Sequence, residues 1–146
     1  MISKLEASFI EKIIGHTVDN KIKWKVYNPK KDSDFNTMPL IDGYKSYSTD
    51  TIYYEERVMD TKTKTLVTKK RKCVFRVDHS PKHIKLICWF IGEYFDLSVF
   101  SIESIDDKTF EYKILDRLFT IIEDSNTKKE NADKISNITS FISNFK

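Results

Sequence analysis

Two apolar runs separated by a short turn constrain the fold of this chain more than any other feature. Residues 72–77 and 84–91 are rich in β-branched and aromatic side chains, and the six residues between them include one proline. Runs of this length and composition favour strands over helices, and so short a connection favours antiparallel pairing. We therefore expect a hairpin with its turn at residues 78–83, and we expect the remaining elements to pack around it.

The first residues of the chain predict an amphipathic helix. Ser3 and Glu6 form a capping-box pattern, in which each side chain bonds the backbone amide of the other residue. Apolar residues then follow at helical spacing up to Ile14, and Gly15 stands where a glycine commonly ends a helix. We expect the apolar side of this helix to face the core.

The last third of the chain predicts two further helices. Asp106 or Asp107 is expected to cap the first of them, whose apolar residues recur at helical spacing. A polar stretch at residues 126–129 is expected to interrupt it, because Thr127 and Glu130 repeat the capping-box pattern. A second helix, also with an apolar side, is then expected to close the chain.

Strands are expected between these helices. Residues 20–27 alternate between apolar and lysine side chains, residues 44–60 favour one long strand, and residues 95–100 fit either a strand or a short helix. The order helix, strands, helix, helix indicates an α+β fold. We predict a single domain over residues 1–146, with an antiparallel sheet of four to five strands. The N-terminal helix and the two C-terminal helices are expected to pack on one face of this sheet.

Composition narrows the classes of function. Hydrophobic residues make up 40% and charged residues 32% of the 146 residues, which suits a globular core, whereas only three glycines argue against a glycine-rich phosphate loop. The start of the chain lacks the unbroken apolar stretch of a signal peptide, so we expect a cytoplasmic protein that does not act at a membrane. Cys73 and Cys88 are then expected to be buried thiols rather than a disulfide. No cofactor is expected.

A long stretch at residues 28–43 has no regular period, and loops of this length are uncommon unless they are functional or disordered. Phe35 and Met38 lie within it, and Tyr53 and Tyr54 lie on the strand that follows. These four side chains are candidate anchors for a protein partner, because aromatic groups dominate many interfaces. The alternative is that the apolar residues of the loop pack back on the core.

A basic run gives a second candidate site. Lys69, Lys70, Arg71 and Lys72 lie on a strand predicted to neighbour the one that carries the tyrosines, and cations beside aromatic rings suit single-stranded nucleic acid. The net charge of +3 does not by itself imply such a partner. The run suits equally well a solvated hairpin whose polar end projects beyond the core. Nucleic-acid binding through the basic hairpin at residues 62–72 is therefore the alternative function.

Two groups contain residue types found in catalytic or metal sites. Asp78, His79 and His83 include metal-ligand types, but a zinc site needs three or four well-spaced ligands, and the proline here makes the segment a turn. Glu55 and Glu56 face opposite sides of a strand, so they do not form paired carboxylates. No serine, cysteine or histidine lies in a family-specific catalytic motif. We therefore expect neither an enzyme nor a metal site.

The order and composition of the expected elements resemble those of small uncharacterised proteins of low-GC bacteria and of their phages and mobile elements. The segments that carry the resemblance are the capped N-terminal helix, Lys21-Ile22-Lys23-Trp24-Lys25-Val26-Tyr27, Tyr44-x-x-Tyr47, Tyr53-Tyr54 and Leu115-Asp116-Arg117-Leu118-Phe119. The resemblance implies a small α+β accessory protein and carries over no catalytic residue. We expect a non-enzymatic accessory or inhibitor protein that binds a protein partner, and the identity of that partner and the oligomeric state stay open.

Overall fold

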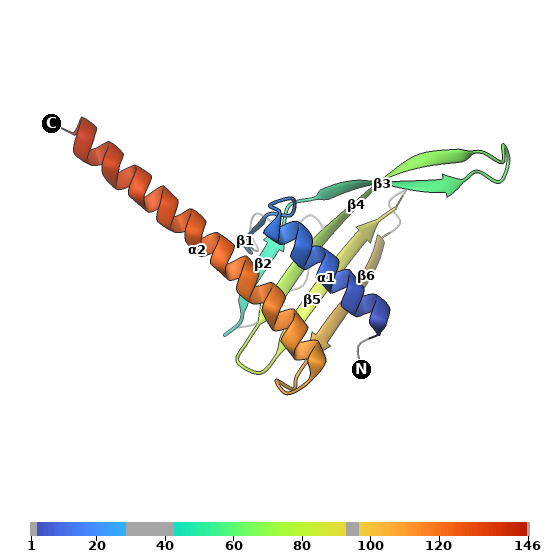
Figure 1. Cartoon of the computed structure of the whole chain (residues 1–146), viewed down its shortest axis with the longest axis horizontal. Coiled ribbons are helices and arrows are strands. Elements are labelled where there is room, and N and C mark those ends of the chain that lie inside the picture. The colour runs from blue at the N-terminus through green and yellow to red at the C-terminus, as the bar shows by residue number, and fades with distance from the viewer. Residues whose placement is uncertain (1–2, 29–42, 93–96, 146) are drawn as a thin grey trace.

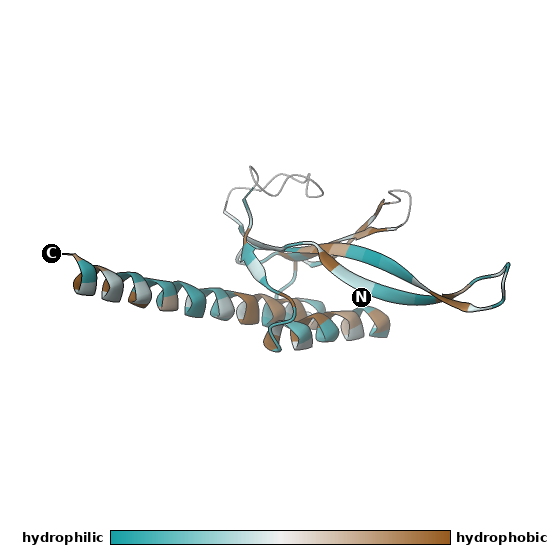
Figure 2. Ribbon diagram, turned by 90° about the horizontal axis from the view of Figure 1, so that it is seen from above, coloured by the Kyte–Doolittle hydropathy of each residue, from teal (hydrophilic) through white to brown (hydrophobic). Residues whose placement is uncertain are grey.

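The computed structural model describes residues 3–28, 43–92 and 97–145. A six-stranded antiparallel sheet carries helices α1 (Lys4–Val18) and α2 (Phe110–Asn144) on the same face (Figures 1 and 2). The predicted α+β class with an antiparallel sheet is confirmed. The prediction of four to five strands and two C-terminal helices is wrong, because the described residues form a sheet of six strands followed by a single C-terminal helix.

The sheet is built around its longest strand. Its strands are β1 (Trp24–Val26), β2 (Lys45–Thr49), β3 (Ile52–Met59), β4 (Leu66–His79), β5 (Ile84–Ile91) and β6 (Leu97–Ser104). They are ordered β1-β2-β4-β5-β6, and β3 pairs with the part of β4 that β2 leaves unpaired. The predicted central hairpin is the β4–β5 pair, in which Val77 lies opposite Leu86. Of the predicted segment at residues 95–100, residues 95–96 lie outside the described residues, and residues 97–100 belong to a strand, β6, and not to a short helix.

The main core lies between the helices and the sheet. Side chains from α1, β4, β5 and α2 meet there, and Ile10, Leu86 and Leu115 have no exposed surface. The ring of Phe9 on α1 contacts the ring of Phe75 on β4 edge-on, with 5.8 Å between the ring centroids. Burial of these aliphatic and aromatic groups fixes both helices on the sheet, since each large apolar side chain contributes roughly 1.5–3 kcal/mol when fully buried.

Helix α1 begins as predicted but ends later. Ser3 Oγ accepts a hydrogen bond from the Glu6 amide at 3.1 Å, and Glu6 Oε1 accepts one from the Ser3 amide at 3.3 Å, which completes the capping box. The helix continues through Gly15 to Val18, and the backbone turns at Asn20, where φ is 61°. Gly15 is therefore not the terminating residue. Asparagine adopts the left-handed conformation more readily than most side chains, so it takes over that role.

Strand β1 is shorter than the predicted strand at residues 20–27. Only Trp24–Val26 pair with β2. The indole N–H of Trp24 donates to Thr17 Oγ1 at 3.0 Å, which links β1 to the end of α1. Val26 is exposed instead of sharing a buried side with Trp24, and the neighbouring Tyr27 is buried against Arg76 on the opposite face of the sheet.

The predicted long strand at residues 44–60 is two strands, β2 and β3, which pair with different parts of β4. Ser48 lies opposite Arg76 and Ile52 lies opposite Cys73, so three residues between them face only two on β4. Such an extra residue bends a strand and disrupts the ladder locally. The Thr49 hydroxyl compensates by accepting a hydrogen bond from the Phe75 amide at 3.0 Å.

Helix α2 is continuous over 35 residues, so the predicted break at residues 126–129 is wrong. Thr109 caps it in place of Asp106 or Asp107, because Thr109 Oγ1 accepts a hydrogen bond from the Tyr112 amide at 3.2 Å. The polar stretch contains neither glycine nor proline, and its residue types are compatible with a helix interior. Of the helices described, none is both long and apolar enough to cross a membrane.

Cys73 and Cys88 are free, buried thiols, as predicted. Burial raises the pKa of Cys73 to about 11 and also raises the pKa of Cys88, so little thiolate forms at pH 8. We expect a thiol-specific reagent at pH 8 to leave both cysteines unmodified in the folded protein and to modify both in urea, as measured by intact mass. Rapid modification of either thiol in the folded protein would contradict its burial.

The same thiols make the stability of the fold sensitive to alkaline pH. A free thiol has a pKa of about 8.5, so the folded state holds its thiol protons to higher pH than the unfolded state does. The stability that Cys73 contributes in this way is fully present below the pKa of the free thiol, about 8.5. It is lost as the pH rises through the folded-state pKa of about 11.

Candidate functional site

The hairpin made by β3 and the first part of β4 projects from the sheet, and we call it the arm (residues 52–73). It leaves the sheet at Ile52 and Cys73 and extends well beyond the helices (Figure 1). Each strand contributes eight paired residues, which correspond to roughly 26 Å at about 3.3 Å per residue. Its turn is closed by backbone hydrogen bonds of 2.8 Å from Asp60 to Thr65 and from Lys64 to Asp60.

Cross-strand pairs of opposite charge hold the arm together away from the core. Arg71 Nε donates to Glu56 Oε2 at 2.6 Å, and Glu55 lies opposite Lys70. A two-stranded ribbon is at best marginally stable in water by itself. Such pairs contribute roughly 0.2–1 kcal/mol each, and together with the ladder they keep the ribbon ordered.

Strand alternation gives the arm two different faces. The face on the side of the helices carries partly covered side chains, including Glu56 and Arg71. On the other side, which we call the open face, Tyr53 is 76% exposed, Met59 is 58% exposed and Leu66 is 65% exposed. The open face consists of Tyr53, Glu55, Arg57, Met59, Leu66, Thr68, Lys70 and Lys72.

The structure brings the described members of the two predicted binding sites onto this one arm. Tyr53 lies opposite Lys72, and Tyr54 lies opposite Arg71. The tyrosines and the cations of the basic run are therefore direct neighbours. The other predicted anchors, Phe35 and Met38, lie outside the described residues.

The basic run is divided between the two faces of the arm. Lys70 and Lys72 belong to the open face, whereas Lys69 and Arg71 belong to the face on the side of the helices. Seven lysines and arginines and three carboxylates in residues 52–73 give the arm a net charge of +4. The whole chain carries +3, so the remaining residues together carry −1. The arm is thus the positively charged part of the protein.

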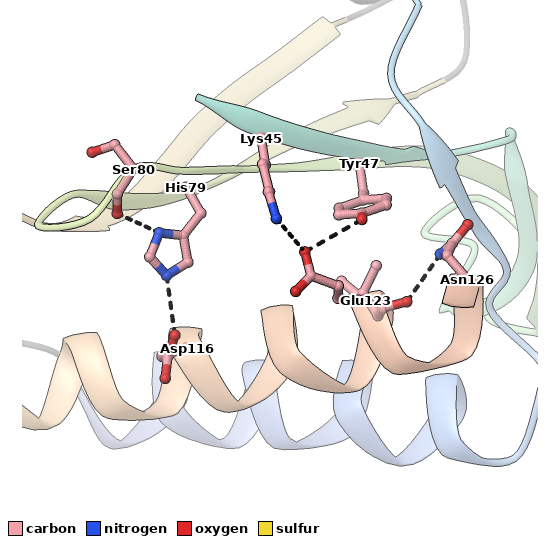
Figure 3. A network of polar contacts seen from close by, with 8 residues as sticks. Lys45, Tyr47, His79, Ser80, Asp116, Glu123 and Asn126 are labelled. Carbon is pink, nitrogen blue, oxygen red and sulfur yellow. Dashed lines mark hydrogen bonds and ion pairs between the residues drawn. The ribbon is translucent and has the colours of Figure 1, made fainter. Parts of the chain in front are cut away.

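A second polar region joins the sheet to α2 (Figure 3). Glu123 accepts hydrogen bonds from Lys45 Nζ at 3.4 Å and from the Tyr47 hydroxyl at 3.5 Å. Nearby, His79 Nε2 lies 3.0 Å from Asp116 Oδ1. Burial, and then the negative charge of Glu123, raise the pKa of Tyr47, so its hydroxyl keeps the proton that it donates. This region anchors α2 on the sheet.

A shallow cavity of about 330 Å³ lies beside this polar region, lined by Gly43, Lys45, His79, Ser80, Pro81 and Phe119. Its two basic side chains, Lys45 and His79, already contact the carboxylates of Glu123 and Asp116. The polar groups of these two side chains are therefore already engaged, so the cavity is a weaker candidate for a binding site than the arm.

The predicted group of Asp78, His79 and His83 does not converge. The first two lie in β4 rather than in the predicted turn, so alternation places them on opposite faces of the sheet. His83 contacts Glu103 Oε2 through Nε2 at 2.8 Å and the Tyr44 hydroxyl through Nδ1 at 2.7 Å. Within residues 3–28, 43–92 and 97–145, no three histidine, cysteine, aspartate or glutamate side chains are grouped closely enough to hold a metal ion.

Sequence reasoning missed a buried ion pair in the middle of the sheet. Arg76 has 0% of its surface exposed and contacts Asp78 twice at 2.8 Å, from Nε to Oδ1 and from Nη2 to Oδ2. Ser46 Oγ also donates to Asp78, and the Tyr27 ring centroid lies 4.2 Å from the Arg76 guanidinium carbon. Two opposite charges two residues apart in an apolar run share one face of a strand, and this spacing was the available signal.

The chain matches no known family model, no curated protein and no solved structure. Its function is therefore inferred from its own residues. Of the regions described above, the arm is the one that presents exposed apolar and charged side chains together.

Proposed function

We propose that the chain is a non-enzymatic binding protein that acts through a protein partner, with the open face of the arm as its contact surface. One observation carries this proposal. Met59 and Leu66 lie opposite each other at the projecting end of the arm, and both are more than half exposed. Grouped apolar side chains on an exposed projection are typical of an interaction site, since burying them releases ordered water.

The composition of the open face describes the kind of partner. Tyrosine, methionine and arginine are enriched in protein interfaces, and the open face offers all three in Tyr53, Met59 and Arg57. The arm also carries the net positive charge of the chain. The complementary surface is a shallow apolar depression with an acidic rim, because opposite charges speed encounter and fix orientation.

Histidine and cysteine side chains are common catalytic groups, and those of His79, His83 and the two cysteines are in contact with carboxylates or buried, which also supports a binding role. His79 contacts Asp116, and His83 contacts Glu103. The two cysteines are buried, with a raised pKa. These groups act as structural partners in the positions that they occupy.

Nucleic-acid binding is the alternative, and the net charge of +4 on residues 52–73 together with the Tyr53–Lys72 pair favours it. The division of the basic run between two faces, and its pairing with Glu55 and Glu56, weaken that alternative. Binding of single-stranded DNA or RNA at low salt, lost in a Lys70→Gln/Lys72→Gln variant and retained in a Lys4→Gln/Lys12→Gln variant of α1, would support the alternative over a protein partner.

A photo-crosslinking residue in place of Tyr53 tests the proposal directly. We expect the full-length variant to crosslink to one protein in extracts of its source cells, because Tyr53 is 76% exposed on the open face. With that protein purified, the Met59→Ser/Leu66→Ser variant should bind at least about tenfold more weakly, since central apolar anchors dominate interface energies. Titration calorimetry measures the change.

The matched control is Leu5→Ser, which changes a leucine that is 80% exposed on α1, away from the arm. It should bind the partner as the unaltered protein does. Equal weakening of binding by Leu5→Ser and by Met59→Ser/Leu66→Ser, or no effect of Met59→Ser/Leu66→Ser, would contradict the assignment to the open face. The predicted origin from a phage or mobile element stays a prediction, and the genes beside this one test it.

A further inference from the structure

The second half of α2 (residues 127–145), which we call the tail, leaves the sheet and extends away from the body (Figures 1 and 2). Every residue of the tail is exposed. Five of them are nevertheless large and apolar, and each is between 50% and 73% exposed: Ile135, Ile138, Phe141, Ile142 and Phe145. The tail thus combines the apolar content of a core helix with the exposure of a surface helix.

The apolar residues of the tail do not continue the side of α2 that packs on the sheet. The residues of α2 that are buried against the sheet are Ile114, Leu115, Leu118, Phe119 and Ile122. At about 100° per residue, the residues Ile135, Ile138, Ile142 and Phe145 are centred roughly 180° around the helix from them. The apolar stripe of the tail therefore faces away from the body of its own chain.

The last residues of the tail also have a low intrinsic helix propensity. Residues 135–144 consist only of isoleucine, serine, asparagine, threonine and phenylalanine, all from the weaker half of the helix-propensity scale. Most helical stability in proteins comes from packing of an apolar side rather than from propensity. A helix with this sequence is stable when its stripe is covered.

The spacing of the apolar stripe indicates that it packs against another helix. Successive members of the stripe, Ile135, Ile138, Ile142 and Phe145, are three, four and three residues apart, which is the alternation of three and four that paired helices use. The stripe is also complementary to itself. In an antiparallel pair centred on residue 140, Ile135 meets Phe145 of the second copy and Ile138 meets Ile142, so an apolar residue fills every layer.

Charge and area agree with a second copy. Residues 135–145 contain no charged side chain, so two copies meet there without repulsion between like charges. Covering the four side chains of the stripe on both copies, with part of Phe141 at its edge, removes on the order of 1,000 Å² of surface, near the lower limit for a specific interface. The two bodies lie at opposite ends of such a pair and do not obstruct each other.

We propose that the tail is a self-association site through which two copies of this chain form an antiparallel, two-stranded helical pair. Because the stripe is short, the dimer has a dissociation constant on the order of micromolar. The proposal does not depend on the function of the arm, since no residue of the tail belongs to the open face.

Sedimentation equilibrium of the full chain tests the proposal. The mass should rise from 17.3 kDa toward twice that value with increasing concentration. Ile138→Asp should weaken association at least about a hundredfold, because a symmetric pair loses two apolar layers and gains two charges. The matched control is Ser140→Asp, which places the same charge on the opposite side of the tail and should leave association unchanged.

A spin label at Lys129→Cys tests the direction of the pair, since both native cysteines are buried. Antiparallel helices place the two labelled positions about 34 Å apart, whereas parallel helices place them about 10 Å apart. The shorter distance would overturn the antiparallel arrangement.

Two further outcomes would overturn the dimer itself. The first is a monomer mass at all concentrations up to millimolar. The second is a monomer that binds vesicles of phosphatidylcholine with one third phosphatidylserine and loses that binding with Ile138→Asp. This second result would assign the stripe to a lipid surface.

Discussion

Replacing Asp78 with alanine should lower the free energy of unfolding by about 3–5 kcal/mol, because it removes a carboxylate that forms an ion pair with a buried guanidinium. Arg76 is fully buried, and its Nε and Nη2 atoms each donate to an Asp78 carboxylate oxygen at 2.8 Å. The Ser46 hydroxyl loses an acceptor as well. Urea unfolding followed by tryptophan fluorescence measures the change.

Asp50→Ala is the matched control for this prediction. Asp50 also forms an ion pair, with Lys25 Nζ at 2.7 Å, but its side chain is largely exposed. Exposed pairs contribute about 0–1 kcal/mol, so this variant should stay close to the unaltered protein. The Arg76→Met/Asp78→Leu double variant should recover much of the loss, since apolar replacement of a buried pair is often neutral. Equal losses for Asp78→Ala and Asp50→Ala would contradict the role of burial.

Ile122→Ala should lower the free energy of unfolding by about 2–5 kcal/mol, because it removes a buried side chain and leaves a cavity between α2 and the sheet. Ile122 has no exposed surface and belongs to the main core. Chemical denaturation at protein concentrations well below the micromolar range measures this effect on the monomer.

The same substitution in the tail separates the two halves of α2. Ile135 is 65% exposed, so Ile135→Ala should change the unfolding free energy of the monomer by no more than about 0.5 kcal/mol. Alanine is also the better helix former, which favours the variant slightly. A loss above 2 kcal/mol for Ile135→Ala at low concentration would place this side chain in the core and contradict its exposure.

Features that depend on a few neighbouring residues were predictable from the sequence. The capping box of Ser3 and Glu6 forms because both partners lie within one helical turn. The β4–β5 hairpin follows from two apolar runs and a short turn. Alternation along the arm correctly separated Glu55 from Glu56, because the period of a strand does not depend on its partner.

Features set by distant residues were not predictable in the same way. Thr127 and Glu130 make the same pattern whether a helix begins there or continues, so the length of α2 was missed. The division between β2 and β3 depends on which part of β4 each strand pairs with. The Glu56–Arg71 contact depends on the register of a turn that has no distinctive sequence. Because the register was unknown, the sequence did not reveal that part of the basic charge of the arm is paired with a carboxylate.

Strand β4 belongs to the arm at one end and to the body at the other. Its fourteen residues run without interruption from Leu66, at the tip of the arm, to His79, which contacts Asp116 of α2. No loop lies between these two ends to absorb a displacement. We therefore expect a displacement of the tip to pass along one continuous strand to the residue that contacts α2.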